Sequence, residues 1–280
     1  MFTHLGYKKY ASCATVGLLT VGLIISSTQK ATAATFSKSW DGEQNSLQNL
    51  LNNITVSGPQ INTEKAQTNY QSFTNTATGI SVGTFMFEVA GMAGSNKLGI
   101  YNKGNHNQRI QLFDGANSPG AGTTINFLET GINVTTQQFN PQTGIPQNNP
   151  PLTSNYYQEP NWNQFGFYLQ NGHGKIFYTE NSLNPDGKQQ AIVYQGNNQT
   201  KLQLPGRQKG TFTDNEYIIA FEDLALGDIA GISSDWDYND LVIMVESIEP
   251  ASVPEPATLV GLTAIVGILG ITRRRIDNKS

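Results

Sequence analysis

The feature that most constrains how this chain can fold is a series of short apolar runs, each ended by Gly, Asn or Pro. The runs are rich in β-branched and aromatic residues, which favour strands. Many short strands with regular turn signals are typical of a sandwich or jelly roll. We therefore expect an all-β fold, with a single β-sandwich or jelly-roll-like domain over residues 34–250. The runs are Val82–Val89, Leu98–Tyr101, Arg109–Phe113, Thr123–Leu128, Ile132–Gln137, Gln164–Leu169, Lys175–Thr179, Gln190–Tyr194, Tyr217–Phe221 and Leu241–Val245.

Two segments depart from this pattern. Ser46–Ile54 has its leucines and isoleucine at helical spacing, which predicts one short N-terminal helix that packs on the domain. Residues 138–160 are rich in Pro, Asn and Gln, which predicts a long surface loop.

Acidic residues adjoin two of the apolar runs. If Tyr217–Phe221 and Leu241–Val245 pair antiparallel, the end of the first run lies beside the start of the second. Carboxylate, amide and carbonyl oxygens are the ligands that Ca²⁺ takes, about six to eight of them. The sequence therefore predicts a Ca²⁺ site at this edge. Its candidate ligands are Glu222, Asp223, Asp235, Asp237, Asn239 and Asp240.

The alternative for these residues is that they only cap turns through their own backbone. Their density favours a metal, because so many carboxylates in one place repel one another unless a cation compensates them. A helix-flanked Ca²⁺ loop is excluded, because the position that requires Gly holds Asp240 and an apolar run follows it. The connecting segment, Leu224–Ser234, is longer than an ordinary hairpin loop.

The N-terminus has the pattern of a secretory signal. Two lysines precede the apolar stretch 14–25, and Ala31-Thr32-Ala33 has the A-x-A form of a cleavage site. We expect signal peptidase to remove residues 1–33 after Ala33. The single Cys lies in this segment, so the mature chain has no disulfide and no thiol site.

The C-terminus has three parts in a fixed order: a Pro-Glu-Pro motif, the apolar stretch 257–272 and a basic cluster. As a helix, the fifteen residues 257–271 would reach about 23 Å, short of a hydrocarbon core of about 30 Å. The order resembles the PEP-CTERM sorting signal. This resemblance implies an exosortase, cleavage near the motif and only a transient stay of the transmembrane-like helix in the inner membrane. The residues concerned are Pro254, Glu255, Pro256, Arg273, Arg274 and Arg275.

Removal of both ends changes the formal net charge from −4 to about −10. An acidic mature chain disfavours nucleic acid as a partner, because nucleic-acid binding needs a basic face. The expected destination is the cell envelope or the extracellular matrix, and the sequence leaves open whether the mature form is released or anchored.

A resemblance to a known family covers about residues 160–248. Phe221–Leu224 and Ser234–Val242 resemble the signature of domain of unknown function family 4114, and Phe165–Leu169 and Phe177–Asn184 resemble its upstream part. The family is found in secreted and surface proteins of bacteria, cyanobacteria among them. It has no assigned activity, so the resemblance implies a setting and a fold rather than a reaction.

The sequence contains no recognised catalytic motif. Neither a G-x-S-x-G nucleophile elbow nor an H-E-x-x-H zinc motif is present, and no pair of carboxylates is singled out as catalytic. Aromatic residues are dense around residues 156–168, where Tyr157 and Trp162 are candidate sugar contacts. The alternative is that these aromatic side chains fill the core.

Three hypotheses remain open. The first is a noncatalytic surface or matrix protein whose β domain is braced by Ca²⁺. The second is a Ca²⁺-dependent carbohydrate-binding protein with an exopolysaccharide as its partner, and the third is a polysaccharide-acting hydrolase. A concave groove with an aromatic side chain would favour the second, and a carboxylate pair in a deep cleft the third.

Overall fold

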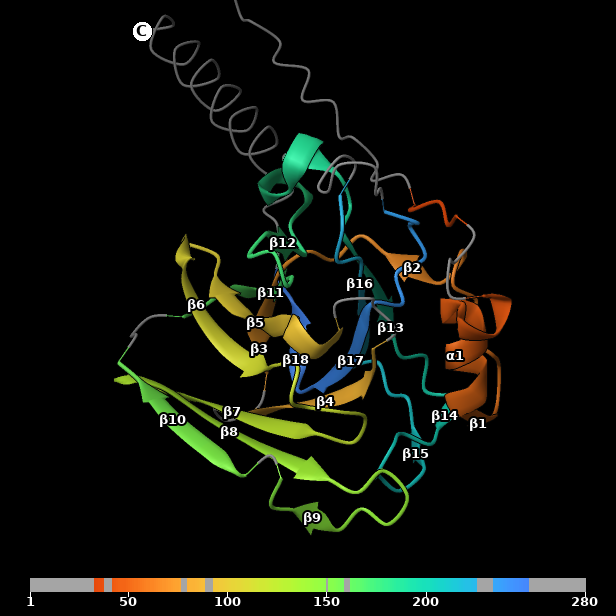
Figure 1. Ribbon diagram of the computed structural model, residues 1–280, viewed down its shortest axis with the longest axis horizontal. Helices are drawn as coiled ribbons and strands as arrows, with labels where there is room; N and C mark the ends of the chain where they lie inside the picture. The colour runs from red at the N-terminus through yellow and green to blue at the C-terminus, as the bar shows by residue number, and fades with distance from the viewer. Residues whose placement is uncertain are drawn as a thin grey trace, which may run out of the picture. The chain divides into compact units, whose positions relative to one another are not determined.

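Two large antiparallel sheets face each other, and a small sheet and one helix lie on the outer side of the larger sheet (Figure 1). The computed structural model describes residues 33–37, 42–76, 80–88, 93–149, 151–158, 162–225 and 234–251. All of them fall within the unit Ala31–Val253. The expected all-β, sandwich-like domain is confirmed.

The larger sheet has nine strands. From edge to edge the order is β10 (Thr153–Tyr157), β8 (Gly131–Phe139), β7 (Gly122–Leu128), β4 (Ile80–Phe87), β17 (Leu241–Glu246), β16 (Glu216–Phe221), β13 (Ala191–Gln195) and β2 (Gln67–Thr68), with β9 (Pro146–Gln147) paired to β8.

The second sheet has six strands, β18 (Ile248–Pro250), β3 (Phe73–Asn75), β11 (Phe165–Gln170), β5 (Lys97–Asn102) and β6 (Asn105–Phe113), with β12 (Ile176–Tyr178) paired to β11. The small sheet consists of β1 (Thr55–Ser57), β14 (Lys201–Leu202) and β15 (Gly210–Thr211). The helical elements are α1 (Leu47–Ile54) and the 3₁₀ turns η1 (Glu43–Asn45), η2 (Ala93–Ser95), η3 (Asn181–Leu183) and η4 (Pro185–Gly187).

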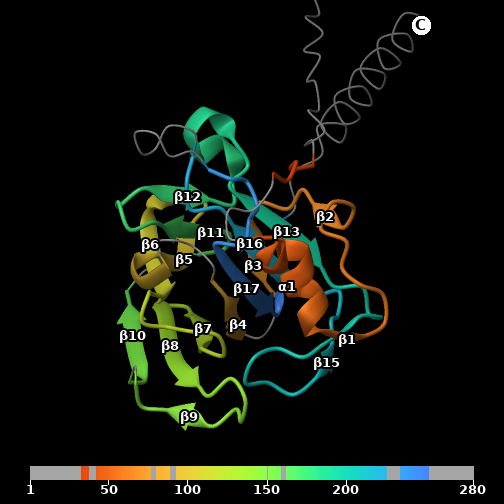
Figure 2. The same ribbon diagram turned by 45° about the vertical axis from the view of Figure 1, so that its right-hand side comes forward.

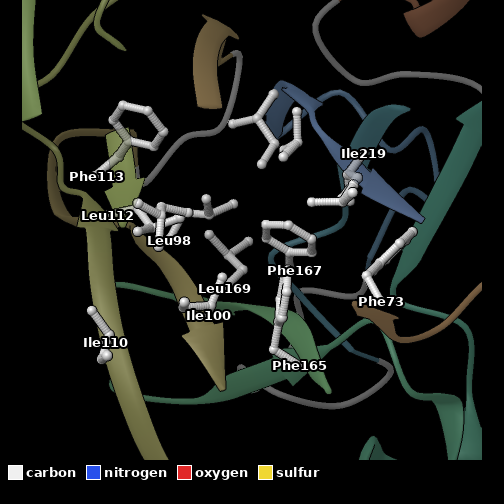
Figure 3. Close-up of a cluster of buried hydrophobic side chains, with 14 of the residues drawn as sticks. Phe73, Leu98, Ile100, Ile110, Leu112, Phe113, Phe165, Phe167, Leu169 and Ile219 are labelled. Atoms are coloured by element: carbon white, nitrogen blue, oxygen red, sulfur yellow. The ribbon is translucent and has the colours of Figure 1, made fainter. Parts of the chain in front are cut away.

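The main core lies between the two large sheets. Phe165, Phe167 and Leu169 come from alternate positions of β11, and they gather with Phe73 and with Ile219 of the larger sheet (Figure 3). Phe73 meets Phe167 edge to face, with ring centroids 5.7 Å apart. Since each fully buried large apolar side chain contributes about 1.5–3 kcal/mol, this layer is a major source of stability.

A second core lies on the outer side of the larger sheet. The helix α1 lies against this side of the sheet (Figure 2). Leu47 and Leu51 of α1 pack there with Ile192 and Ile218, and the small sheet adds Leu202. Ser46 begins the helix, because its Oγ accepts a hydrogen bond from the backbone N–H of Asn49 at 3.4 Å. The predicted helix is confirmed.

Strands β16 and β17 are buried on both faces. In β16, Tyr217, Ile219 and Phe221 point into the main core, while Ile218 and Ala220 point into the second one. This explains why both strands are continuous apolar runs rather than alternating ones. Their predicted antiparallel pairing is confirmed, with Phe221 opposite Leu241 and Glu216 opposite Glu246.

Each predicted apolar run corresponds to a strand, but the interpretation of residues 138–160 as one long loop is wrong. Strands β9 and β10 lie within it, and all five residues of β10 pair with β8. The polar composition misled the prediction because β10 is an edge strand whose side chains are mostly exposed, so it lacks the apolar pattern of an inner strand.

Candidate metal centre

The predicted acidic residues gather at one end of the β16–β17 pair. Strand β16 ends at Phe221 and β17 begins at Leu241, and these two residues are partners in the sheet. Glu222 and Asp223 therefore leave the sheet beside Asp240. Residues 226–233 of the connecting segment lie outside the described part of the chain.

Two groups of carboxylates lie close enough to hold a cation. One carboxylate oxygen from each of Glu222, Asp235 and Asp237 lies within 4.8 Å of the others. The same is true of Glu222, Asp223 and Asp240. Asp235 is half-buried and the other four are buried, so the two groups differ in their access to solvent.

Hydrogen bonds fix the second of these groups. The backbone N–H of Asp223 donates to Oδ2 of Asp240 at 2.7 Å, and Nδ2 of Asn96 donates to Oδ2 of Asp223 at 3.0 Å. Nδ2 of Asn171 donates to the carbonyl oxygen of Asp223 at 2.9 Å. The side chains are therefore held in place by neighbouring loops.

Asn239, the predicted amide ligand, is buried and faces the side of the sheet on which the η1 turn lies. Its Nδ2 donates to the carbonyl oxygen of Asn45 at 2.7 Å, and its backbone N–H donates to Oδ1 of Asp237 at 3.2 Å.

Two aromatic residues hold the acidic loop against the second core. Trp236 and Tyr238 have positive φ values of 52° and 55°, which are uncommon for residues with large side chains. The hydroxyl of Tyr238 donates to the carbonyl oxygen of Gln189 at 3.0 Å, and its ring packs edge to face on Phe36. These contacts maintain a backbone conformation that is intrinsically unfavourable.

Burial raises the pKa of two carboxyl groups in the centre, those of Glu222 and Asp240. The pKa of Glu222 is raised to about 8, first by desolvation and then by the negative charges of Asp235, Asp237 and Asp223, against a hydrogen bond from Ser234. The pKa of Asp240 is raised well above its ordinary value, by burial first and then by the charge of Glu222. Without a counter-ion, this burial favours the protonated forms of Glu222 and Asp240.

The sequence analysis missed Glu88 and Asn96. Glu88 follows β4, which pairs with β17 so that Phe87 lies opposite Val242. Its pKa is raised to about 8, by burial first and also by the charge of Asp223. An acidic residue directly after a strand was a usable signal, but the pairing of β4 with β17 is not visible in the sequence.

Several buried oxygen atoms at this end of the sheet have no hydrogen-bond partner: Oε2 of Glu222, Oε1 of Glu88, Oδ1 of Asn96 and Oε1 of Gln190. A buried polar atom without a partner costs about 1–3 kcal/mol, so such atoms are rare in folded proteins. All four are oxygens, and hard cations such as Ca²⁺ and Mg²⁺ take oxygen ligands.

The predicted sugar contacts lie elsewhere. Trp162 is only 7% exposed and belongs to the main core, so its ring offers little surface to a ligand. Tyr157 is half-buried and lines a cavity of about 340 Å³ between β6, β8 and β10. The lining includes Asp114, Asn117 and Asn155, which offer polar groups beside the tyrosine ring.

The predicted export and sorting signals lie largely outside the described residues. Ala33 is described and exposed, whereas Pro254, Glu255, Pro256, Arg273, Arg274 and Arg275 are not described. Within the described ranges, no helix is long and apolar enough to cross a membrane. The predicted helix 257–272 is not among them.

Comparison with known proteins gave one match. No curated protein and no solved structure matches the chain. The match to a family model begins upstream of the resemblance noted in the sequence and includes β7, β8 and β10 as well as β16 and β17. Residues 120–248, which contain all the acidic residues of the candidate metal centre except Glu88, match the family described as Domain of unknown function (DUF4114).

Proposed function

We propose that this chain is an exported, noncatalytic protein of the cell surface or extracellular matrix, and that a structural Ca²⁺ site braces its β domain. The observation that carries the metal site is Oε2 of Glu222, a buried oxygen without a partner on a residue that belongs to both carboxylate groups. Repulsion among carboxylates that lie this close together is relieved either by protons or by a cation. At neutral pH and extracellular calcium levels, the cation is the better compensation.

Ca²⁺ is the expected ion because the candidate ligands are oxygens, and Ca²⁺ accepts them in a flexible geometry. Mg²⁺ demands a tight octahedral shell and releases its water reluctantly. Extracellular Ca²⁺ sites typically have Kd values of about 10⁻⁴ to 10⁻³ M. The site would then be filled outside the cell.

Thermal unfolding of the purified protein tests this proposal. Ca²⁺ at a hundredfold excess over Kd should stabilise the fold by about 2.7 kcal/mol relative to EGTA. Mg²⁺ should give a much smaller rise in melting temperature, and Asp237→Asn should reduce the Ca²⁺ effect. Glu216→Gln is the matched control, because Glu216 lies at the other end of β16. Identical melting temperatures in EGTA and in several millimolar Ca²⁺ would refute the metal site.

Export and sorting are supported by the terminal patterns alone. Processing by signal peptidase and an exosortase should leave a chain of about residues 34–255. The intact mass of the protein outside the cell tests this, because a secreted species that retains residues 273–280 would contradict the sorting step.

A second function, Ca²⁺-dependent carbohydrate binding, is favoured by the cavity at Tyr157. It is lined by one aromatic ring with amide and carboxylate groups, the chemistry that recognises sugar hydroxyls and their apolar faces. The lining loop packs tightly on the η2 turn, since a Cβ on Gly115 would lie 2.1 Å from the carbonyl oxygen of Gly94. Asn96 follows that turn and donates a hydrogen bond to Asp223. The turn therefore links the cavity to the metal centre.

Retardation on gels of the cell's own exopolysaccharide tests this second function. Tyr157→Ala should abolish the retardation, and EGTA should weaken it. Tyr156→Ala is the control, because Tyr156 is exposed and does not line the cavity. If no exopolysaccharide of the producing cell retards the protein, the carbohydrate function is wrong and the structural role stands alone.

A further inference from the structure

The two carboxylate groups of the candidate metal centre overlap at a single residue. Glu222 is a member of the group with Asp235 and Asp237, and also of the group with Asp223 and Asp240. A carboxylate has two oxygens and can bind two cations at once, one through each oxygen. The overlap therefore allows two adjacent sites that share one bridging ligand.

The charge of the centre also favours more than one cation. Five carboxylates belong to the two groups, and Glu88 lies close enough to Asp223 for their charges to interact. A single divalent cation offsets two negative charges, fewer than the five carboxylates of the two groups carry when all of them are ionised. A second divalent cation would offset more of this charge, because nearby like charges repel one another.

Unpartnered oxygens accompany the inner group, which consists of Glu222, Asp223 and Asp240. Gln190 is fully buried, its Nε2 donates to the carbonyl oxygen of Leu224 at 2.9 Å, and its Oε1 has no partner. Asn96 is 1% exposed and bonds Asp223 through Nδ2, while its Oδ1 has no partner. These two amide oxygens belong to residues that contact the inner group or its backbone. Their lack of a partner is an observation separate from the spacing of the carboxylates.

We propose that the centre holds two divalent cations bridged by Glu222, a proposal that rests on the metal site proposed above. The inner cation is held by Glu222, Asp223 and Asp240, all of them buried. The outer cation is held by Glu222, Asp235 and Asp237, and it reaches solvent beside the half-buried Asp235. The inner ion should exchange slowly and the outer ion quickly.

Native mass spectrometry of the purified protein measures the number of bound ions directly. The protein is first stripped with EGTA and then titrated with Ca²⁺. Two ions per chain at saturation support the inference. One ion overturns it while leaving the single structural site in place, and no bound ion refutes both.

Variants separate the two sites. Asp240→Asn should leave only the outer ion, and the double variant Asp235→Asn with Asp237→Asn should leave only the inner one. Glu222→Gln should weaken both, while Glu216→Gln, outside the centre, should keep two. If Asp240→Asn and the double variant each abolish all binding, the residues form one site and the inference is wrong.

Folding of each variant is checked by far-UV circular dichroism in EGTA. The wild-type count decides the question even if a variant does not fold. The rate at which labelled Ca²⁺ leaves the wild-type protein is a further readout, with two phases expected for two sites. A single phase that accounts for all bound Ca²⁺ would contradict the difference between inner and outer ions.

Discussion

The backbone N–H of Asp223 donates to the side chain of Asp240, and this bond continues the pairing of β16 with β17 past the last residue of β16 and ahead of the first residue of β17. The acidic centre is thus attached to two inner strands of the larger sheet. Because these strands are buried on both faces, a change in the centre acts on strands that contribute to both cores. Metal binding and global stability should therefore be coupled.

The first prediction concerns pH in the absence of metal. The pKa of Glu222 is raised to about 8 in the folded protein from its ordinary value of 4.5, so the folded state binds the proton more tightly than the unfolded chain. The resulting stabilisation is complete below the unfolded value and is lost as the pH rises through about 8. In EGTA, the melting temperature should therefore fall between about pH 5 and pH 9.

Two controls accompany this pH series. Glu222→Gln should flatten the fall, because the amide does not ionise, although Glu88 with its raised pKa should leave part of it. Excess Ca²⁺ should stabilise the protein more at high pH, since a cation binds the deprotonated carboxylates. A melting temperature that rises with pH in EGTA over this range would contradict the predicted direction.

The second prediction concerns the packing of α1. Leu51 is fully buried in the second core, so Leu51→Ala should destabilise the protein by about 2–5 kcal/mol. Leu50 is only half-buried, and Leu50→Ala is the matched control with a clearly smaller effect. Urea unfolding at constant pH and Ca²⁺ measures both, and equal effects would show that α1 does not contribute through its buried face.

The third prediction concerns a glycine in the middle of β5. A Cβ on Gly99 would lie 2.1 Å from the backbone carbonyl oxygen of Ile110, so Gly99→Ala forces β5 and β6 apart. We expect a loss of about 1–3 kcal/mol in unfolding free energy. Gly210 has no atom within 4 Å of its added Cβ, so Gly210→Ala should change stability by less than about 0.5 kcal/mol. Equal stabilities of the two variants in urea would contradict this explanation.

The fourth prediction concerns the segment that matches the family. Residues 120–248 lack β4, which lies between β7 and β17, and β5, which pairs with β11. Expressed alone, this segment should fail to fold and should aggregate through its unpaired strand edges. Residues 34–251 are the control and should give a sharp thermal transition. A cooperative transition from 120–248 alone would disprove the requirement for the earlier strands.

The sequence predicted the parts of the fold that depend on local pattern. The apolar runs and the spacing of the leucines near residue 50 each indicated the right element, because burial imposes a period on them. Strand β10 escaped prediction because an exposed edge strand carries no apolar pattern.

The sequence likewise predicted only the part of the candidate site that depends on neighbouring strands. Glu222 and Asp240 were expected to meet because the strands beside them form a simple antiparallel pair. Glu88 was not, because its place depends on β4, more than a hundred residues from β17 in the chain. No local pattern in the sequence indicates which distant strands become neighbours in the sheet.

That long-range pairing has a consequence for how the protein acquires its structure. The larger sheet is completed only when β17 fits between β4 and β16, and β17 is among the last strands to be synthesised. Chains dominated by such nonlocal contacts fold slowly. Closing a long loop costs conformational entropy, and the contacts that offset this cost form only after the ends of the loop have met. The chain should therefore remain open until it is nearly complete, which is a state suited to passage through a membrane before folding.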